Sequence, residues 1–444
     1  MKLIYDVDGK PEFKELLMFG FQQLLAIIAA TIVVPVIVNG TGVSNLNLDP
    51  AAALFGAGVG TLVYVLFTKK KSPVFLGSSF AFLSSMSSAT AFGYFGLVLG
   101  AFFAGLVYVV IALVIRVTSS EWINKLMPPV VIGPTVALIG LSLAGSAISD
   151  FTKSNLNGQS YSLVAIIIGV FTLLVTCIVS VRSKGMGKLI PFIIGLICGY
   201  TLALVLTVIG KSTGNEALMI LDYSKFFDCF KPFTIKSIFR VPDFAFVHLF
   251  SELSDIKYQF SEFINIFTLY APVALVVFAE HVADHKNISS IIGKDLLKDP
   301  GLDNTLLGDG VGSMVGAFFG TCPNTTYGES IACVAVTKNA SVRTIIVTAI
   351  MAIVLSFFSP FVAFVNSIPS CCFGAMCTIL YGFISVSGLK MIQKVDLGDD
   401  KNLFVVGTIL ITGIGGLFLD FGVIQITGIA TSLILGIIIN KILK

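Results

Sequence analysis

The sequence predicts an all-α polytopic membrane protein, and its composition, the spacing of its apolar runs and the placement of its basic residues support this. Of the 444 residues, 56% are hydrophobic and only 12% are charged, whereas a soluble domain carries about 25% charged residues. The chain holds 42 Gly and 38 Phe. Small residues let membrane helices pack closely, so this composition is typical of a helical bundle in lipid.

Apolar runs of about 20 residues, the length that crosses a bilayer, occur fourteen times along the chain. The third, ninth and tenth runs are short or weak, and the others are clear. The predicted transmembrane segments are centred near residues 28, 60, 82, 105, 137, 172, 200, 274, 312, 330, 353, 380, 411 and 432. An even number of segments places both termini on the same side of the membrane.

Basic residues alternate with these segments. If the N-terminus is cytoplasmic, 21 of the 28 Lys and Arg residues fall in cytoplasmic segments, and six of the others lie in one long external segment, 211–263. Long loops are exempt from the positive-inside rule, so the alternation supports both the count and the orientation. We therefore expect a cytoplasmic (inner) membrane protein with both termini in the cytoplasm. The first apolar stretch, Leu16–Asn39, is too long for a signal peptide and is expected to be a span.

The chain divides near residue 240 into halves that share weak internal similarity. MPPVVIGPTVALIGLSLAG (127–145) in segment 5 matches IPSCCFGAMCTILYGFISVSG (368–388) in segment 12, each with a Gly five residues after its entry Pro. Because seven segments per half is an odd number, the second copy must be inserted upside down. The sequence thus predicts two inverted seven-segment repeats, an arrangement in which secondary transporters hold substrate near the midplane.

Segments 3 and 10 occupy matching positions and are both unusual. They read PVFLGSSFAFLSSMSSA (73–89) and GTCPNTTYGESIACVAV (320–336), and each opens with residues that disfavour helix. We expect a short extended piece followed by a half-helix in each, because non-helical backbone is tolerated in the membrane only beside protein or a cavity. Two half-helix N-termini, with their unpaired N–H groups, would form a donor-rich pocket. The alternative is two Ser/Thr-rich helices in close contact.

Three of the 25 acidic residues fall inside the predicted segments, Glu280 and Asp284 in segment 8 and Glu329 in segment 10. An ionised carboxylate at the bilayer centre costs at least ~2.5–3.5 kcal/mol. Neither segment contains a basic residue before its cytoplasmic end, at Lys286 and Lys338, so the acids indicate a binding or proton-relay site rather than an ion-paired network. Glu280 and Asp284 share one helix face, and two close carboxylates do not both ionise cheaply. We hypothesise that this pair carries a proton.

Other chemistries find little support. His281 and His285 are four residues apart, but a zinc protease needs Glu directly after the first His, and here Glu280 precedes it. We expect no metal site, and we expect His285, beside Lys286, at the cytoplasmic interface. The eight Cys are expected to be small core residues. No GxxxxGK[ST] loop occurs, which disfavours an ATP-driven pump, and the net charge of +3 implies no nucleic-acid partner.

Four stretches carry a family resemblance. They are AEHVADHKN (279–287), KDLLKDPGLDNTLLGDGVGS (294–313), GAFFGTCPNTTYGES (316–330) and LGSSFAF (76–82). Together they resemble the nucleobase–ascorbate transporter family in its uracil permease branch. The similarity covers most of the chain and is weakest in residues 211–263.

The resemblance implies two domains, a core and a gate. Segments 1–4 and 8–11 (residues 16–117 and 264–365) would form a core domain. Segments 5–7 and 12–14 (118–211 and 366–444) would form a gate domain, with 212–263 as the external segment. The implied activity is uptake of uracil with H+, by an elevator-like movement of core against gate. We expect no enzyme activity, no cofactor beyond the coupling ion, and a homodimer formed through the gate domain.

Three alternatives to uracil uptake stay open. The first is a xanthine or hypoxanthine:cation symporter of the same fold. The remote alternatives are an anion transporter and a membrane enzyme.

The site residues follow from the resemblance by position. Glu280 and Glu329 would be the substrate carboxylates, Phe80 and Gly328 would offer backbone N–H groups, and Tyr327 would line the site. Uracil presents two ring N–H donors and two carbonyl acceptors, and these groups match such a site. Proton coupling is assigned to Glu280 and Asp284. The side chains expected just behind the site are Ser330, Ser79, Thr326 and Tyr381.

The chain departs from the family pattern at three positions. Ser330 and Ala332 replace an Asn and a Gly of the segment 10 signature, and Asp284 stands where some relatives have His. Ser still forms hydrogen bonds but reaches less far than Asn. Glu329, where purine transporters have Gln, favours the uracil branch.

Overall fold

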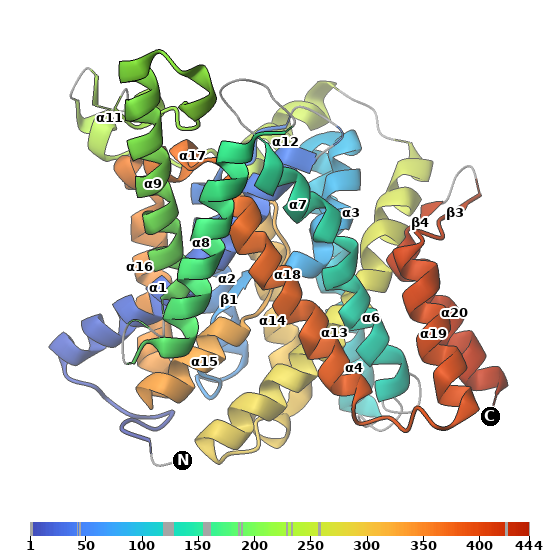
Figure 1. Ribbon diagram of the computed structural model, residues 1–444. Coiled ribbons are helices and arrows are strands. Elements are labelled where there is room, and N and C mark those ends of the chain that lie inside the picture. The colour runs from blue at the N-terminus through green and yellow to red at the C-terminus, as the bar shows by residue number, and fades with distance from the viewer. Residues whose placement is uncertain are drawn as a thin grey trace.

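The computed structural model describes residues 3–41, 43, 46–118, 128–153, 161–184, 187, 190–227, 230–231, 234–255, 259–421 and 425–443. Most of these residues are helical (Figure 1), which agrees with the all-α prediction. Eight helical stretches in the described part are long and apolar enough to cross a membrane. Shorter apolar helices occupy Gly328–Thr337, Val342–Ser356 and Gly428–Ile442. The exact number of fourteen segments stays a prediction.

The first half of the chain consists of helices and one short strand. Its elements are α1 (Phe13–Thr41), α2 (Pro50–Phe67), β1 (Leu76–Ser78), η1 (Phe80–Phe82), α3 (Leu83–Ala89), η2 (Thr90–Phe92), α4 (Gly93–Val117), α6 (Pro129–Ser142), α7 (Ala144–Thr152), α8 (Leu163–Arg182) and α9 (Pro191–Thr213).

The second half repeats this order after a connecting segment. The connecting elements are η4 (Glu216–Leu218), α10 (Ser224–Phe227), α11 (Ile235–Ile238) and α12 (Ala245–Asp255). The elements that follow are α13 (Phe260–Ile292), η6 (Leu297–Gly301), α14 (Leu302–Gly320), β2 (Asn324–Thr326), α15 (Gly328–Thr337), α16 (Val342–Ser356), α17 (Ser359–Ser367), α18 (Ser370–Ile392), α19 (Asp400–Ile414), β3 (Leu419–Asp420), β4 (Gln425–Ile426) and α20 (Gly428–Ile442).

The extended pieces predicted for segments 3 and 10 are present as β1 and β2. The two strands pair antiparallel, with Leu76 opposite Thr326 and Ser78 opposite Asn324, and both are buried. Pairing gives each strand partners for its backbone groups inside the protein, as a non-helical segment at membrane depth requires. The strands come from opposite halves of the chain, so this pairing joins the two halves.

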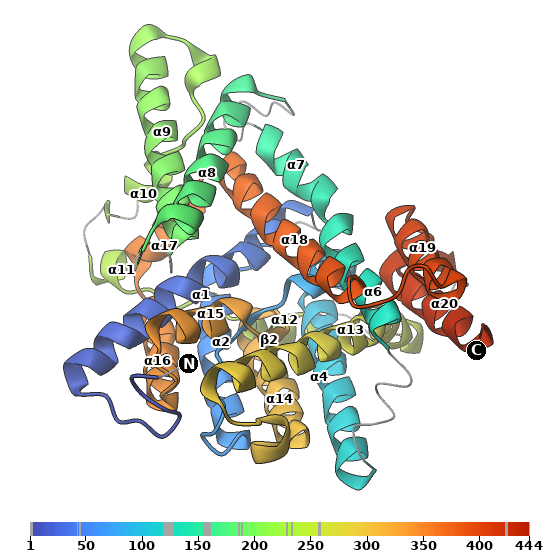
Figure 2. The ribbon, with the colours of Figure 1, turned by 60° about the horizontal axis from the view of Figure 1, so that its bottom comes forward.

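The helices separate into two groups when the molecule is turned. Figure 2 shows α1, α2, α4 and α13–α16 on one side and α6–α9 with α18–α20 on the other. The two stretches matched in the sequence, 127–145 and 368–388, become α6 and α18, which pack against each other. Corresponding pieces of the two halves therefore meet in space.

Close glycine contacts hold the helices together within each group. A Cβ built on Gly56 of α2 would lie 2.3 Å from the backbone oxygen of Gly316 in α14. In the other group, a Cβ on Gly140 of α6 would lie 2.3 Å from the backbone oxygen of Tyr381 in α18. Only Gly permits these approaches, and such contacts are typical of membrane helix interfaces.

The connecting segment is anchored to the first group. Arg240 forms an ion pair with Asp49 at the start of α2. Glu252 of α12 accepts hydrogen bonds from the backbone nitrogens of Tyr94 (3.0 Å) and Phe95 (2.9 Å), at the N-terminus of α4. A carboxylate at this position pairs orphan N–H groups and interacts favourably with the helix dipole.

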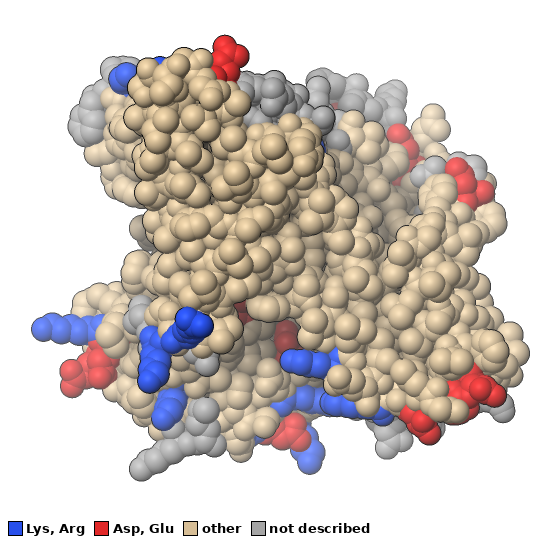
Figure 3. Space-filling view, viewed as in Figure 1, with Lys and Arg blue, Asp and Glu red and all other residues tan. Residues whose placement is uncertain are grey.

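Charge is distributed unevenly along the molecule. Both ends of the chain lie at one end of the molecule in Figure 1, and Figure 3 shows most visible Lys and Arg side chains gathered at that same end. Acidic side chains are also visible inside a hollow just above these basic residues in Figure 3.

Candidate functional site

Two helices begin beside the paired strands and face a common space. The η1 turn begins at Phe80 and α15 begins at Gly328, and in each case a single residue separates the helix from the preceding strand. Phe80 and Gly328 both line a small cavity of about 90 Å³. Because the first N–H groups of a helix have no partner within it, the strand pairing brings two sets of backbone donors to one place.

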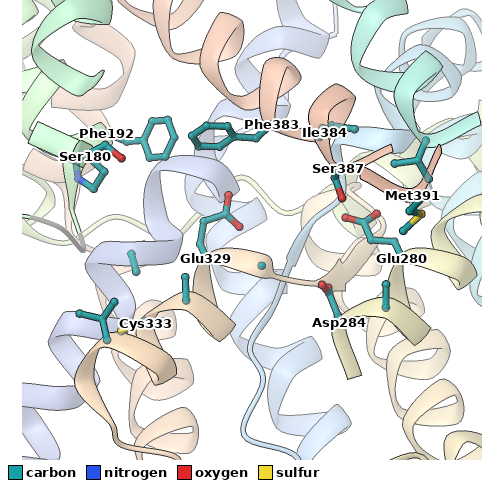
Figure 4. A pocket seen from close by; sticks show the side chains of 17 residues that line it. Ser180, Phe192, Glu280, Asp284, Glu329, Cys333, Phe383, Ile384, Ser387 and Met391 are labelled. Atoms are coloured by element: carbon teal, nitrogen blue, oxygen red, sulfur yellow. The ribbon is translucent and has the colours of Figure 1, made fainter. Parts of the chain in front are cut away.

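Three carboxylates surround a larger cavity that continues from the small one. Glu280 and Asp284 of α13 and Glu329, in the first turn of α15, line this cavity of about 460 Å³. Figure 4 shows Glu280 and Glu329 pointing into the same space from different elements. No Lys or Arg is among the described residues that line either cavity, so the carboxylates have no basic partner there.

The larger cavity opens toward the end of the molecule that carries the chain termini. Among its lining residues are Ser180 and Met391, each within two residues of the last residue of its helix, and Pro191, the first residue of α9. Figure 3 shows the hollow with its acidic residues near that end. The carboxylates are therefore reached from the terminal side.

Most of the residues predicted for the site lie at the small cavity. Its lining includes Glu280, Glu329, Phe80, Gly328, Tyr327, Ser79 and Thr326. Tyr327 is fixed there because its hydroxyl donates to the Ser78 carbonyl oxygen at 2.9 Å. Asp284 lines only the larger cavity, where it accepts a hydrogen bond of 2.7 Å from the Thr326 hydroxyl. The buried Ser79 hydroxyl has no hydrogen-bond partner among the described residues.

Ser330 and Tyr381 line neither cavity and lie behind the site. Ser330 accepts a hydrogen bond from the Gln23 amide of α1 and another, of 3.0 Å, from the backbone nitrogen of Phe75. It thus ties α15 to α1 and to the segment before β1. Tyr381 of α18 is buried with its ring edge against Phe80, at 6.1 Å between ring centroids.

A fourth intramembrane acid was missed by the sequence analysis. Asp309 of α14 is fully buried, and its Oδ2 lies 2.7 Å from Nδ1 of His281. The other ring nitrogen of His281 lies 3.0 Å from the Thr305 hydroxyl. The statement that only three acids lie inside the segments is therefore wrong. Asp309 lies in the Gly-rich, weakly apolar ninth segment, and no pattern in the sequence identifies the helix that it contacts.

The prediction that His285 lies at the interface is also wrong. His285 is completely buried, its Nδ1 donates to the His281 carbonyl oxygen at 2.8 Å, and its Nε2 lies 2.7 Å from the Tyr64 hydroxyl. The reason is that α13 continues to Ile292, almost two turns further, and this face of the helix packs on α2 and α14. Both His residues lie on the side of α13 away from the cavity.

Comparisons with known proteins establish the family of this chain. The Xan_ur_permease family model, which describes a permease family, matches residues 14–421. This chain belongs to that family, the nucleobase–ascorbate transporters. The predictions of a membrane transporter and of no enzyme are thereby confirmed.

Relatives of this permease cover nearly the whole chain. This permease is 37% identical over 446 residues to the uracil permease of Bacillus caldolyticus. The matched region covers 100% of this chain and 95% of the relative. It is 35% identical over 432 residues to the uracil permease of Bacillus subtilis, covering 96% of this chain and 92% of the relative.

One solved structure shows that the fold is shared more widely. The transmembrane domain of the cyanobacterial bicarbonate transporter BicA has a TM-score of 0.60 to this permease, at 13% identity, covering 97% of this chain and 98% of that one. At this identity the likeness establishes the fold alone.

Proposed function

We propose that this permease is a secondary active uracil:proton symporter of the cytoplasmic (inner) membrane. The observation that carries the proposal is a cavity lined by Glu280, Asp284 and Glu329, without a basic partner, beside two helix N-termini. Relatives named as uracil permeases at 35–37% identity support the substrate.

The geometry suits a small ligand that donates and accepts hydrogen bonds. Uracil has two ring N–H groups, which Glu280 and Glu329 would accept, and two carbonyls, which the N–H groups of Phe80 and Gly328 would serve. A buried polar ligand binds well when every such group is paired. The same carboxylates argue against an anion as substrate, even though the fold occurs in a bicarbonate transporter.

Proton coupling is assigned to Glu280 and Asp284. They lie one turn apart on α13 and line the same cavity. Two neighbouring carboxylates inside the membrane do not both carry charge cheaply, so a proton is needed when the site is occupied and closed. Its release at neutral cytoplasmic pH would return the site to its open, charged form.

Alternating access is assigned to an elevator-like movement of a core domain (16–117 and 264–365) against a gate domain (118–211 and 366–444). A separate cavity of about 350 Å³, lined by Leu83 and Leu143 among others, lies beyond the site on the far side from the termini. Only about one helical turn separates these residues from Phe80 and Ile139 of the small cavity. A short movement of one group of helices along the other would close the site on the side of the termini and open it on the opposite side. In this proposal the fold has fourteen segments in two inverted repeats, cytoplasmic termini and a dimer contact on the gate.

The test is uptake of radiolabelled uracil into proteoliposomes with an imposed pH gradient. Glu280→Gln and Glu329→Gln should each weaken uptake by about 10- to 100-fold, because a charge-assisted hydrogen bond contributes about 1.5–3 kcal/mol. Glu216→Gln, in the exposed η4 turn, is the matched control and should transport normally.

Other outcomes would redirect the proposal. Accumulation of xanthine or hypoxanthine without uracil would move this permease to the purine branch. Uracil uptake that follows a Na+ gradient and ignores pH would overturn the assignment of the coupling ion.

A further inference from the structure

An aromatic side chain of the gate-side helices is left uncovered at the site. Phe383 of α18 is 56% exposed, yet it lines both the small and the larger cavity. Its neighbour Phe192, at the start of α9, meets it edge to face, with 6.3 Å between ring centroids and an interplanar angle of 81°. Figure 4 shows the two rings together on the wall across from Glu280 and Glu329.

The junction of the two cavities has two chemically different walls. Six residues line both cavities, and three of them, Glu280, Gly328 and Glu329, come from α13 and α15. The other three, Val136, Phe383 and Ile384, come from α6 and α18. The first wall offers carboxylates and a backbone N–H group, whereas the second offers only apolar surface.

A planar heterocycle held at the first wall by its polar edge exposes its ring faces. Water covers those faces poorly, and an aromatic side chain covers them well, because every base has a π-face for stacking. A large apolar side chain that stays exposed in an internal cavity is the feature expected where a ligand completes the packing. Ile384 and Val136 are too small to cover a ring.

Free space opposite the ring is provided by Gly328. A Cβ built on Gly328 meets nothing within 4 Å, so the backbone does not require glycine there for packing. A side chain at this position would instead enter the cavity. The open volume at Gly328 and the exposed ring of Phe383 together limit what fits at the junction.

We propose that Phe383, held by Phe192, is the residue that binds the face of the base and limits the ligand to a single six-membered ring. This inference rests on the proposed nucleobase transport and names the residue that selects among nucleobases. The carboxylates recognise the N–H groups that uracil and xanthine share, so size selection must come from the opposite wall.

The experiment compares Phe383→Ala, Phe383→Leu and Phe383→Tyr in proteoliposomes. Phe383→Ala should raise the KM for uracil about 5- to 100-fold, in line with the loss of one base–aromatic stack. Phe383→Leu keeps apolar volume without a ring and should fall between Ala and the parent, and Phe383→Tyr should retain uracil affinity. Competition by xanthine and hypoxanthine should strengthen in Phe383→Ala. Phe404→Ala, at a 60% exposed ring of α19 that lines neither cavity, is the control.

The outcomes separate this inference from the function on which it rests. If the parent transports uracil and Phe383→Ala stays within twofold of its KM, the inference is overturned while the function stands. If the parent transports no nucleobase, the proposed function itself has failed. Should Phe383→Ala not yield a monodisperse protein, equal KM values for Phe383→Leu and the parent would overturn the inference just as well. Gly328→Ala should lower uracil uptake without loss of folded protein, and normal uptake would contradict the size limit.

Discussion

The buried pair of His281 and Asp309 makes a testable contribution to stability. Both side chains are 0% exposed, and 2.7 Å separates Nδ1 of His281 from Oδ2 of Asp309. The second carboxylate oxygen of Asp309 has no hydrogen-bond partner among the described residues. The imidazole is therefore the main compensation for burying this carboxyl group.

The magnitude follows from what each substitution leaves behind. Asp309→Leu leaves a buried imidazole nitrogen unpaired, and His281→Leu leaves a buried carboxyl group unpaired. Removing one partner of a buried pair costs about 3–5 kcal/mol, whereas replacing both partners by apolar residues is often close to neutral. The double variant should therefore lose less unfolding free energy than the two single variants lose together, by at least ~2 kcal/mol. Asp309→Asn keeps an acceptor for the imidazole and should lose only about 1–2 kcal/mol.

The assay is chemical unfolding of the purified parent, both single variants and the double variant in mixed micelles. The coupling between the residues is the difference between the double loss and the sum of the single losses. Losses that add within about 0.5 kcal/mol would refute the reasoning, because independent sites behave in that way. The pair would then be neighbours without an energetic interaction.

Three further predictions concern stability outside the cavity. Gly140→Ala should cost about 1–3 kcal/mol by forcing α6 from α18, whereas Gly407→Ala, where a Cβ meets nothing within 4 Å, should not; equal unfolding free energies would count against the contact. The hydrogen bond from Lys294 lowers the pKa of Asp6 below its ordinary value of 3.8. The unmodified protein should therefore be more stable than Asp6→Asn at pH values above 3.8. This difference should fade as the pH drops through the lowered pKa, and an unfolding series that shows it fading near neutral pH would contradict the assignment. Glu252→Gln should cost about 1 kcal/mol through a weaker cap on α4, and an unchanged unfolding midpoint would show that this cap is dispensable.

The sequence was most informative where composition and physical constraint coincide. The stretch before Phe80 and the stretch before Gly328 contain Gly, Pro, Ser and Thr in place of helix formers, and inside a membrane such segments need internal partners. This reasoning predicted both extended pieces, which the structure forms as a paired ladder. The register of that ladder was out of reach, since the two strands are about 250 residues apart and only the surrounding helices align them.

The missed network lay outside what periodicity can detect. Asp309 is flanked by glycines in a segment of low hydropathy, and its partner His281 is 28 residues away. Burial of an acidic residue can be predicted only when its partner is known. Here the packing of α13 against α14 brings His281 to Asp309. The same pairing buried His285, which the adjacent Lys286 had made to look like a surface residue. Phe383 was overlooked for the opposite reason, because one more Phe among 38 carries no signal until its exposure inside the cavity is seen.

The distribution of close contacts supports the proposed division into two moving groups. Within the first group α2 and α14 meet backbone to backbone at Gly56, and within the second α6 and α18 meet in the same way at Gly140. Contacts of this kind leave no room for sliding, since any shift brings a Cα against a carbonyl. Between the groups the cavities lie side by side, and the surfaces that face each other there are carboxylates on one side and partly exposed apolar side chains such as Phe383 on the other. Two such surfaces that face each other across a cavity cost little to displace, so movement would follow this boundary rather than break the helix pairs. On this reasoning a substitution at Gly56 or Gly140 should reduce stability before it alters substrate choice, whereas one at Phe383 should do the reverse.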